Sequence, residues 1–259
     1  MNMTINACAL AVLTAVGGGA AAADQGPAAG LGRETRPVDA RVQRVKLDGL
    51  VELRLRQGSP AALVISGEAR QLARVTTRQQ GDTLVIDVED GEGLFNTRGL
   101  ARAELTLPQL REVVSDSLGA TEITGFSGDR LEVSLEGAGP MKVAASYRIL
   151  RANLEGLGSM TIQGGASDTI ELNLMGAGFV NLSGQAKWLR ANLGGLGGLD
   201  AQQFQAENVA IELGGLGNAT VFARQSAALS LSGLGSVTVY GKPVTRNVSV
   251  DGLGKVSWR

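Results

Sequence analysis

Residues 211–221 read Ile-Glu-Leu-Gly-Gly-Leu-Gly-Asn-Ala-Thr-Val, and this stretch contains the unit that decides the fold. The unit is centred on the triplet Gly215-Leu216-Gly217. Apolar residues lie four and two positions before the first glycine and four and six positions after it: Ile211, Leu213, Ala219 and Val221. Because side chains alternate between the two faces of a β-strand, this spacing predicts a half-buried strand on each side of a glycine-containing turn.

The unit occurs seven times between residues 133 and 258. Its first glycines are 19, 20, 19, 20, 18 and 19 residues apart, and the four apolar positions are apolar in every copy. The seven triplets contain the structural glycines Gly137, Gly139, Gly156, Gly158, Gly176, Gly178, Gly195, Gly197, Gly215, Gly217, Gly233, Gly235, Gly252 and Gly254. A fixed period in this range is typical of a solenoid, in which each repeat forms one rung and stacks on its neighbours.

The sequence therefore predicts an all-β, single-domain β-solenoid, similar to a parallel β-helix, with rungs of 19–20 residues. One rung cannot bury its own apolar face, so the array is stable only when stacked rungs share a continuous core. We expect glycine where the chain turns, with positive φ, and where rungs approach closely. Trp258 lies in an apolar position of the last rung, where we expect it to help seal that end of the solenoid.

Three segments are expected along the chain. Residues 1–23 contain a short apolar run followed by small residues and an Ala-x-Ala site, which predicts a signal peptide. Residues 24–36, rich in Ala, Gly and Pro, are expected to form a flexible leader. Residues 37–259 are expected to form the solenoid domain, with an irregular part over residues 37–115 and regular repeats over residues 116–259. No helix is predicted.

The signal peptide predicts an exported protein, located in the periplasm or at the cell surface of a bacterium. The apolar run in residues 1–23 is too short to cross a bilayer as a helix. We therefore expect no transmembrane span in the mature chain.

Composition excludes several classes of function. The chain has no histidine, and its single cysteine, Cys8, lies in the expected signal peptide. Catalytic triads of the Ser-His-Asp and Cys-His kinds are therefore excluded, and the commonest metal ligand is missing. The net charge of −1 and the aromatic content of 3% argue against binding to nucleic acid. We expect no cofactor and no metal ion.

Two alternative interpretations of the glycine triplets have specific requirements. A phosphate-binding loop needs a glycine turn that opens a helix, whereas here each triplet leads into an alternating strand such as residues 236–239. A calcium-binding solenoid needs a nine-residue period with an Asp after each glycine pair, and only Asp200 comes near that pattern. We interpret the triplets as structural.

Two carboxylates provide an enzymatic alternative. Glu136 and Glu155 each precede a triplet, in neighbouring rungs and on the outward face of the strand. A catalytic pair in a glycoside hydrolase needs carboxyl groups roughly 5–10 Å apart, which neighbouring rungs allow. Isolated charges on a solvated face are far commoner, so we assign no catalytic residue.

The middle residue of the triplet is Leu in five of the seven rungs, and four of these rungs are consecutive: Leu196, Leu216, Leu234 and Leu253. Simple alternation points these side chains outward, where they would form an apolar stripe of the kind that marks an interface. A corner made by the two glycines would instead break the alternation and turn each Leu into the core. We expect the second arrangement and retain the first as a possible interface.

One outward position carries asparagine in three successive rungs, at Asn153, Asn173 and Asn192. Stacked amides can donate hydrogen bonds to one another along a solenoid. We expect a stabilising ladder here rather than a ligand site.

Five short motifs precede the regular triplets, at residues 36–38, 45–49, 51–58, 81–86 and 105–110. Together with the triplets they resemble the GIN domain, the head domain of an auto-transporter adhesin family (domain of unknown function 2807). The resemblance extends from about Arg36 to Arg259. It implies a secreted or envelope-facing β-helical domain, for which adhesion is the family label and no activity is generally known.

We therefore expect a non-catalytic envelope or surface protein that presents a β-solenoid for binding or adhesion to a protein or glycan partner in the cell envelope. Two alternatives stay open. One is a carbohydrate-active β-helix enzyme. The other is a structural or assembly protein of the envelope that associates with itself through the exposed ends of the solenoid.

Overall fold

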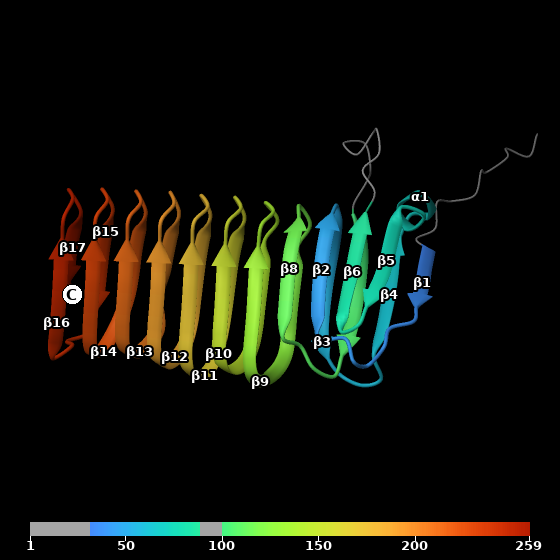
Figure 1. The fold of residues 1–259 in the computed structure, drawn as a ribbon, viewed down its shortest axis with the longest axis horizontal. Helices are drawn as coiled ribbons and strands as arrows, with labels where there is room; N and C mark the ends of the chain where they lie inside the picture. Colours follow the sequence, from blue (N-terminus) through green and yellow to red (C-terminus); the bar gives the residue numbers. More distant parts are fainter. Residues whose placement is uncertain (1–31, 89–99) are drawn as a thin grey trace, which may run out of the picture. The chain divides into compact units, whose positions relative to one another are not determined.

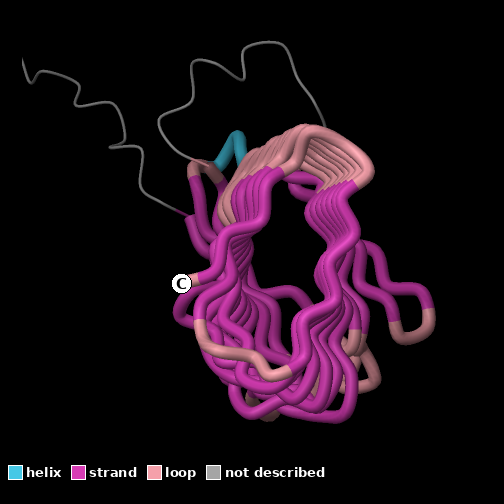
Figure 2. The backbone as a smooth tube through the Cα atoms, turned by 90° about the vertical axis from the view of Figure 1, so that its left-hand side faces the viewer, coloured by secondary structure: helices cyan, strands magenta, loops and turns pink. Residues whose placement is uncertain are grey.

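The computed structural model describes residues 32–88 and 100–259. These residues are almost entirely β-structure and coil into a solenoid whose rungs lie side by side (Figure 1). Viewed along the solenoid axis, the backbones of successive rungs superimpose (Figure 2). Buried side chains fill the space that they enclose. The predicted all-β solenoid is therefore confirmed. The expected signal peptide, residues 1–23, lies outside the described residues.

The regular part consists of long, bent strands that each form most of one rung: β9 (Thr121–Leu135), β10 (Met141–Leu154), β11 (Ser159–Leu174), β12 (Phe179–Leu193), β13 (Gly198–Leu213) and β14 (Asn218–Leu231). Consecutive strands pair in parallel, in sequence order. The remaining rungs use the shorter strands β15 (Ser236–Tyr240), β16 (Thr245–Val250) and β17 (Lys255–Trp258). The glycine triplets form the corners between one long strand and the next.

The strand register stacks equivalent positions of the repeat on top of one another. The position two residues before the first glycine illustrates this, because five successive pairings join its six leucines into one column: Leu135, Leu154, Leu174, Leu193, Leu213 and Leu231. In the first six regular rungs all four predicted apolar positions are buried. The shared core therefore forms as the repeat predicts.

The core is wider than the sequence pattern indicated. A further apolar column lies six residues before the first glycine, and it is buried in every rung from Leu131 to Ala227: Leu131, Leu150, Ile170, Leu189, Val209 and Ala227. On the side of the rung away from the triplets, Phe126, Tyr147 and Phe204 fill the interior. The Tyr147 hydroxyl donates a hydrogen bond of 2.7 Å to the carbonyl oxygen of Leu110.

The triplet glycines are required for close approach between rungs and not for an unusual φ. None of the fourteen has positive φ, so the expected positive φ at these positions is wrong. A Cβ atom built at Gly217 would lie 2.1 Å from the carbonyl oxygen of Gly197 in the preceding rung. Backbone amides of each corner donate to carbonyls of the corner before it, for example from Leu216 to Gly195 at 3.2 Å. This stacking leaves no space for a side chain.

The amino-terminal part is irregular, as predicted. Its elements are β1 (Gly32–Arg36), β2 (Arg44–Gly49), β3 (Val51–Gln57), β4 (Ala62–Gly67), α1 (Ala69–Leu72), β5 (Val75–Gln80), β6 (Thr83–Val88), β7 (Ala101–Leu107) and β8 (Glu112–Ser117). The rung made by β2 and β3 lies between the β6–β7 rung and the β8–β9 rung, with parallel pairing on both sides. Antiparallel strands β1, β4 and β5 complete this end of the solenoid.

Two expectations for this part need correction. Residues 32–36 were assigned to a flexible leader, but they form β1, because their backbone pairs antiparallel with β4. Residues 24–31 of the leader lie outside the described residues. A single helical turn, α1, forms where no helix was predicted, and Glu68 and Gln71 cap it reciprocally. Within residues 32–88 and 100–259, no helix has the length and apolar character needed to cross a membrane.

The carboxyl-terminal rung is only partly covered. Trp258 packs against the core as expected, and the guanidinium carbon of Arg246 lies 4.3 Å from the centroid of its ring. Val248 and Val250, in core columns of the same rung, stay 45% and 42% exposed because no further described rung stacks on them. Trp258 therefore covers part of this end but does not seal it.

Candidate functional site

The corners of the solenoid are rigid and in register. In four consecutive corners, from Ala177 to Leu234, the backbone amide of the middle residue donates to a glycine carbonyl of the preceding rung, as from Leu196 to Gly176 at 3.1 Å. These hydrogen bonds run along the solenoid axis. The middle residues of successive triplets are therefore held directly above one another.

The middle leucines point into solvent. Leu196, Leu216, Leu234 and Leu253 are 65%, 54%, 60% and 85% exposed. The expectation that the corner would turn them into the core is wrong. The glycines allow the backbones of successive corners to stack closely, and they do not turn the chain back on itself. The side chain of the middle residue therefore lies on the convex side of the turn. The possible interface stripe is thus exposed.

The stripe continues beyond the four predicted leucines. Every middle residue in eight successive corners is apolar: Leu118, Ala138, Leu157, Ala177, Leu196, Leu216, Leu234 and Leu253. Leu118 and Leu157 are 61% and 73% exposed, and both alanines are exposed. We call these eight residues the corner ridge. At about 4.8 Å per rung its seven intervals span roughly 34 Å.

The corner ridge is unusual for a surface that faces only water. Two further apolar side chains flank it in one rung, Met175 and Phe179, which are 51% and 45% exposed. Single exposed leucines are normal, but a contiguous apolar line of this length marks an interaction surface. A partner that covered the corner ridge would gain roughly 25 cal/mol of binding free energy for each Å² of apolar area removed from water.

The two candidate catalytic carboxylates lie beside the corner ridge. Glu136 and Glu155 are exposed, and each precedes the first glycine of its corner in adjacent rungs. Neither lines any of the three pockets described below. The structure thus places both on an exposed edge of the solenoid, outside these three pockets.

A polar groove lies on the sheet face that follows the corners. Three adjoining hollows of about 270, 170 and 230 Å³ share lining residues and follow one another along the solenoid axis. Their floor is a column of outward residues paired strand to strand: Arg54, Glu122, Lys142, Thr161, Asn181 and Asp200. We call this column and its flanking side chains the polar groove. Its first half is charged, and Arg54 and Glu122 form an ion pair at 3.6 Å.

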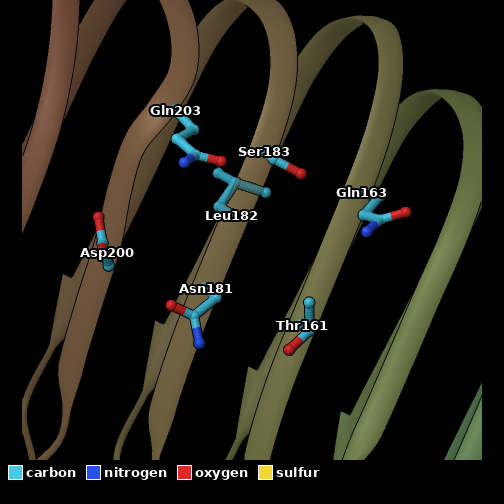
Figure 3. A pocket seen from close by; sticks show the side chains of 7 residues that line it. All are labelled: Thr161, Gln163, Asn181, Leu182, Ser183, Asp200 and Gln203. Carbon is cyan, nitrogen blue, oxygen red and sulfur yellow. The ribbon is translucent and has the colours of Figure 1, made fainter.

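The second half of the polar groove is lined by hydroxyl and amide groups, one carboxylate and the buried Leu182. Figure 3 shows Thr161 and Gln163 on β11, Asn181 and Ser183 on β12, and Asp200 and Gln203 on β13. A β-bulge on β13 positions Gln203, because residues between Ala201 and Gln205 have no counterpart on β14. Bulges commonly redirect a side chain toward a binding site.

The asparagine ladder is present in part. The Asn173 amide donates to the Asn153 side-chain oxygen at 2.9 Å, and the Asn153 amide donates to Ser134 Oγ at 3.2 Å. The backbone register continues to Asn192, although its side chain makes no hydrogen bond within the described residues. The ladder is a stabilising feature of the outer face between rungs, as expected.

An exposed cluster of charges lies on the remaining side of the rungs. Lys187 Nζ lies 2.7 Å from an Asp168 carboxyl oxygen, and Arg148 lies 3.5 Å from the other. The hydrogen bond from Lys187, with a smaller contribution from Arg148, lowers the pKa of Asp168. Such exposed pairs add little to stability. Among the described residues no group of three or more His, Cys, Asp or Glu side chains is placed to hold a metal ion.

The polar groove was not anticipated from the sequence. Its residues occupy ordinary outward positions, where Thr, Asn and Ser are expected on a solvated face. One signal was available: the repeat containing β13 is 20 residues long and the next is 18, which indicates extra residues on β13. The sequence located four leucines of the corner ridge, and simple strand alternation pointed them outward as observed, whereas the inward-turning corner that we expected is wrong.

Comparison with protein families identifies the class to which this solenoid belongs. The family model described as "Putative auto-transporter adhesin, head GIN domain" matches residues 42–243. The match covers more than half of the chain, and the protein belongs to this adhesin-like family. The resemblance noted from the motifs is confirmed. A comparison with curated proteins finds no significant match.

Solved structures with the same fold come from proteins of Bacteroides and Parabacteroides species. A protein of Bacteroides fragilis titled a putative adhesin is 20% identical, with a TM-score of 0.69, over 90% of this chain and 99% of that one. A putative adhesin of Parabacteroides merdae is 18% identical, with a TM-score of 0.79, over 88% and 96%. A protein of Parabacteroides distasonis titled a putative lipid binding protein is 18% identical, with a TM-score of 0.73, over 86% and 96%. At these identities the likeness concerns the fold.

Proposed function

We propose that this protein is an exported, non-catalytic binding protein of the bacterial envelope, which holds its partner against the corner ridge. The observation that carries the proposal is the exposure of apolar side chains in eight successive corners along a rigid edge. Membership of the adhesin-like family supports a surface or exported location. The predicted signal peptide supports the same location.

The geometry of the corner ridge favours binding over catalysis. The ridge is convex and one side chain wide, so it suits insertion into an apolar groove of a partner rather than enclosure of a substrate. Glycine stacking fixes the corners before binding, which keeps the entropy cost of association small. The positions of Glu136 and Glu155 outside the three pockets support a non-catalytic role.

The proposal is tested by measuring saturable binding of fluorescently labelled protein to washed cells of the producing bacterium and to cells with opened envelopes. The ridge variant carries Leu196→Asp, Leu216→Asp and Leu234→Asp. Its control carries the same number of new charges in nearby rungs, Asn192→Asp, Ser230→Asp and Asn247→Asp. We expect the ridge variant to bind at least tenfold more weakly and the control to bind like the parent. Equal binding by the ridge variant and the parent would overturn the proposal.

A specific observation favours a second role in self-association. At the carboxyl-terminal rung, β16 and β17 pair only with the preceding rung among the described residues, and two valines of the core columns are exposed. Unpaired strand edges invite pairing with another chain. Sedimentation over a range of concentrations should show a dimer that Val248→Lys weakens. A monomer at all concentrations would remove this role.

A further inference from the structure

The polar groove has hydrogen-bonding groups that the fold does not use. Within residues 32–88 and 100–259, the side chains of Thr161, Gln163, Asn181 and Gln203 make no hydrogen bond to another residue. They come from three neighbouring strands and line one hollow of about 230 Å³ (Figure 3). The amides and the hydroxyl offer both donors and acceptors at this one place. A ligand with many hydroxyl groups matches such a mixed set, because each hydroxyl both donates and accepts.

The charge of the hollow selects against anionic ligands. Asp200 is its only ionisable lining residue, and no Lys or Arg lines it. One Asp200 carboxyl oxygen accepts a hydrogen bond from the backbone amide of Gln202 at 3.1 Å, which fixes the orientation of the carboxylate. A phosphate, sulfate or carboxylate in this hollow would face a negative charge with no cation in the lining, and in the adjoining hollow Lys142 is accompanied by the carboxylate of Glu122. The ligand class is therefore polar and uncharged.

An exposed aromatic ring lies on β12 two residues before Asn181, which lines the hollow. Phe179 and Asn181 both point outward from β12, two residues and about 6.6 Å apart along the strand. The Phe179 ring leans over the next rung at Gly198, where an added Cβ would lie 2.6 Å from ring atom Cε2. Glycine at position 198 thus provides the space in which the ring lies flat. The residue stays 45% exposed, so part of its surface is available to a ligand.

An aromatic surface beside amide, hydroxyl and carboxylate groups is complementary to a sugar. A pyranose ring has an apolar face of C–H groups that stacks on an aromatic ring, and its hydroxyls lie around its edge. The hollow also continues into the next one, with which it shares Thr161 and Gln163. This continuity along the solenoid axis suits a linear chain lying across successive rungs.

We infer that the polar groove binds a neutral, linear saccharide, with a sugar ring stacked on Phe179 and its hydroxyls hydrogen-bonded to Asn181, Asp200 and Gln203. The site contains none of the eight residues of the corner ridge, although Phe179 flanks the ridge, so the inference goes beyond the proposed function and does not depend on it. Thr161, Gln163 and Ser183 contact the neighbouring sugar in the chain.

The inference is tested by nuclear magnetic resonance titration of the ¹⁵N-labelled protein with linear hexasaccharides. The neutral probes are built of glucose, mannose, galactose or N-acetylglucosamine, and the anionic probe is hexagalacturonate. We expect at least one neutral probe to produce saturable shifts that are largest for residues of β11, β12 and β13 around the groove. Hexagalacturonate should bind more weakly than that probe.

Four variants separate the groove from the rest of the surface. Phe179→Ala and Asn181→Ala should each weaken binding of the neutral probe by about five- to tenfold. Gly198→Ser should have a similar effect, because its side chain displaces the ring. The ridge substitution Leu216→Asp should leave saccharide binding unchanged. Because residues 179 and 181 are exposed, their variants should melt like the parent, which distinguishes lost binding from lost folding.

Three results would overturn the inference: no saturable shift with any neutral hexasaccharide at millimolar concentration, unchanged binding by both Phe179→Ala and Asn181→Ala, or preferential binding of hexagalacturonate. Asp200→Asn adds a test of the charge argument, since it should reduce the discrimination against hexagalacturonate. Failure of this titration leaves binding by the corner ridge intact, and failure of the ridge experiment leaves the titration intact.

Discussion

Gly217 lies directly over Gly197 along the solenoid axis, so that the carbonyl oxygen of Gly197 occupies the space where a Cβ of residue 217 would be, 2.1 Å from it. The same relationship links Gly215 to Gly195. At its two glycine positions the corner is therefore a stack of backbone atoms with no side chain between the rungs. This stack holds the leucines between the glycines in a straight line.

Substitution of a stacked glycine should unfold the solenoid locally or make it aggregate. Gly217→Val forces the rungs apart at the corner and should cost more than about 3 kcal/mol, because overpacking a rigid backbone contact cannot be relieved by side-chain motion. Circular dichroism during heating measures the loss of stability. Asn218→Ser is the control, since Asn218 is exposed and the change removes only the two hydrogen bonds that its Oδ1 accepts from Ser236. If both variants melt like the parent, the stacked-rung account is wrong.

Two leucines three residues apart should respond in opposite ways to substitution. Leu193 is 1% exposed and Leu196 is 65% exposed. Leu193→Ala should lower the free energy of unfolding by about 2–5 kcal/mol, whereas Leu196→Ala should change it by less than about 0.5 kcal/mol. Urea unfolding of both variants measures the difference. A large loss at residue 196 would show that the middle leucines are buried after all.

The buried Tyr147 should make stability depend on alkaline pH. Burial raises the pKa of Tyr147 from 10.0 to about 12. Because the folded pKa is above the unfolded pKa, the folded state binds the proton more tightly, and the stabilisation is complete below pH 10 and is lost as the pH rises to about 12. Urea unfolding of the parent and of Tyr147→Phe across this range isolates the contribution.

The Tyr147→Phe variant should also be less stable at neutral pH. It leaves the carbonyl oxygen of Leu110 without its hydrogen bond of 2.7 Å, which should cost about 1–3 kcal/mol. The gap between parent and variant should narrow above pH 10. A constant gap up to pH 12 would mean that the hydroxyl does not titrate as its burial requires.

The regular rungs could be predicted because equivalent positions of the repeat pair with one another, so the repeat itself defines the register between strands. Four apolar positions around each triplet define two strand faces, and stacking of identical units buries them at equivalent places, as at Leu154 and Leu174. The terminal rung departs from the pattern for a physical reason. Val248 has the same place in the repeat as Leu229, but nothing described covers it, so it stays exposed.

The candidate site was less predictable because it depends on backbone geometry that residue types do not encode. Simple alternation through the corner points Leu216 outward, as the structure has it, and the expected break at the glycines does not occur, because hydrogen bonds between successive corners stack their backbones. The polar groove depends on a bulge in β13 and on a ring lying over Gly198. Both are relations between rungs, whereas the sequence pattern describes one rung at a time.

The central claim is that the corner ridge is covered by a partner in the envelope, and cysteine reactivity in the cell tests it most directly. The only native cysteine, Cys8, is replaced by Cys8→Ser, and a single thiol is introduced by Leu216→Cys or, as a control on the outer face, by Asn192→Cys. A small thiol reagent that enters the envelope is applied to cells and to purified protein. We predict that residue 216 reacts rapidly in purified protein and at least tenfold more slowly in cells, while residue 192 reacts equally in both. Equal reactivity of residue 216 in cells and in purified protein would contradict the claim.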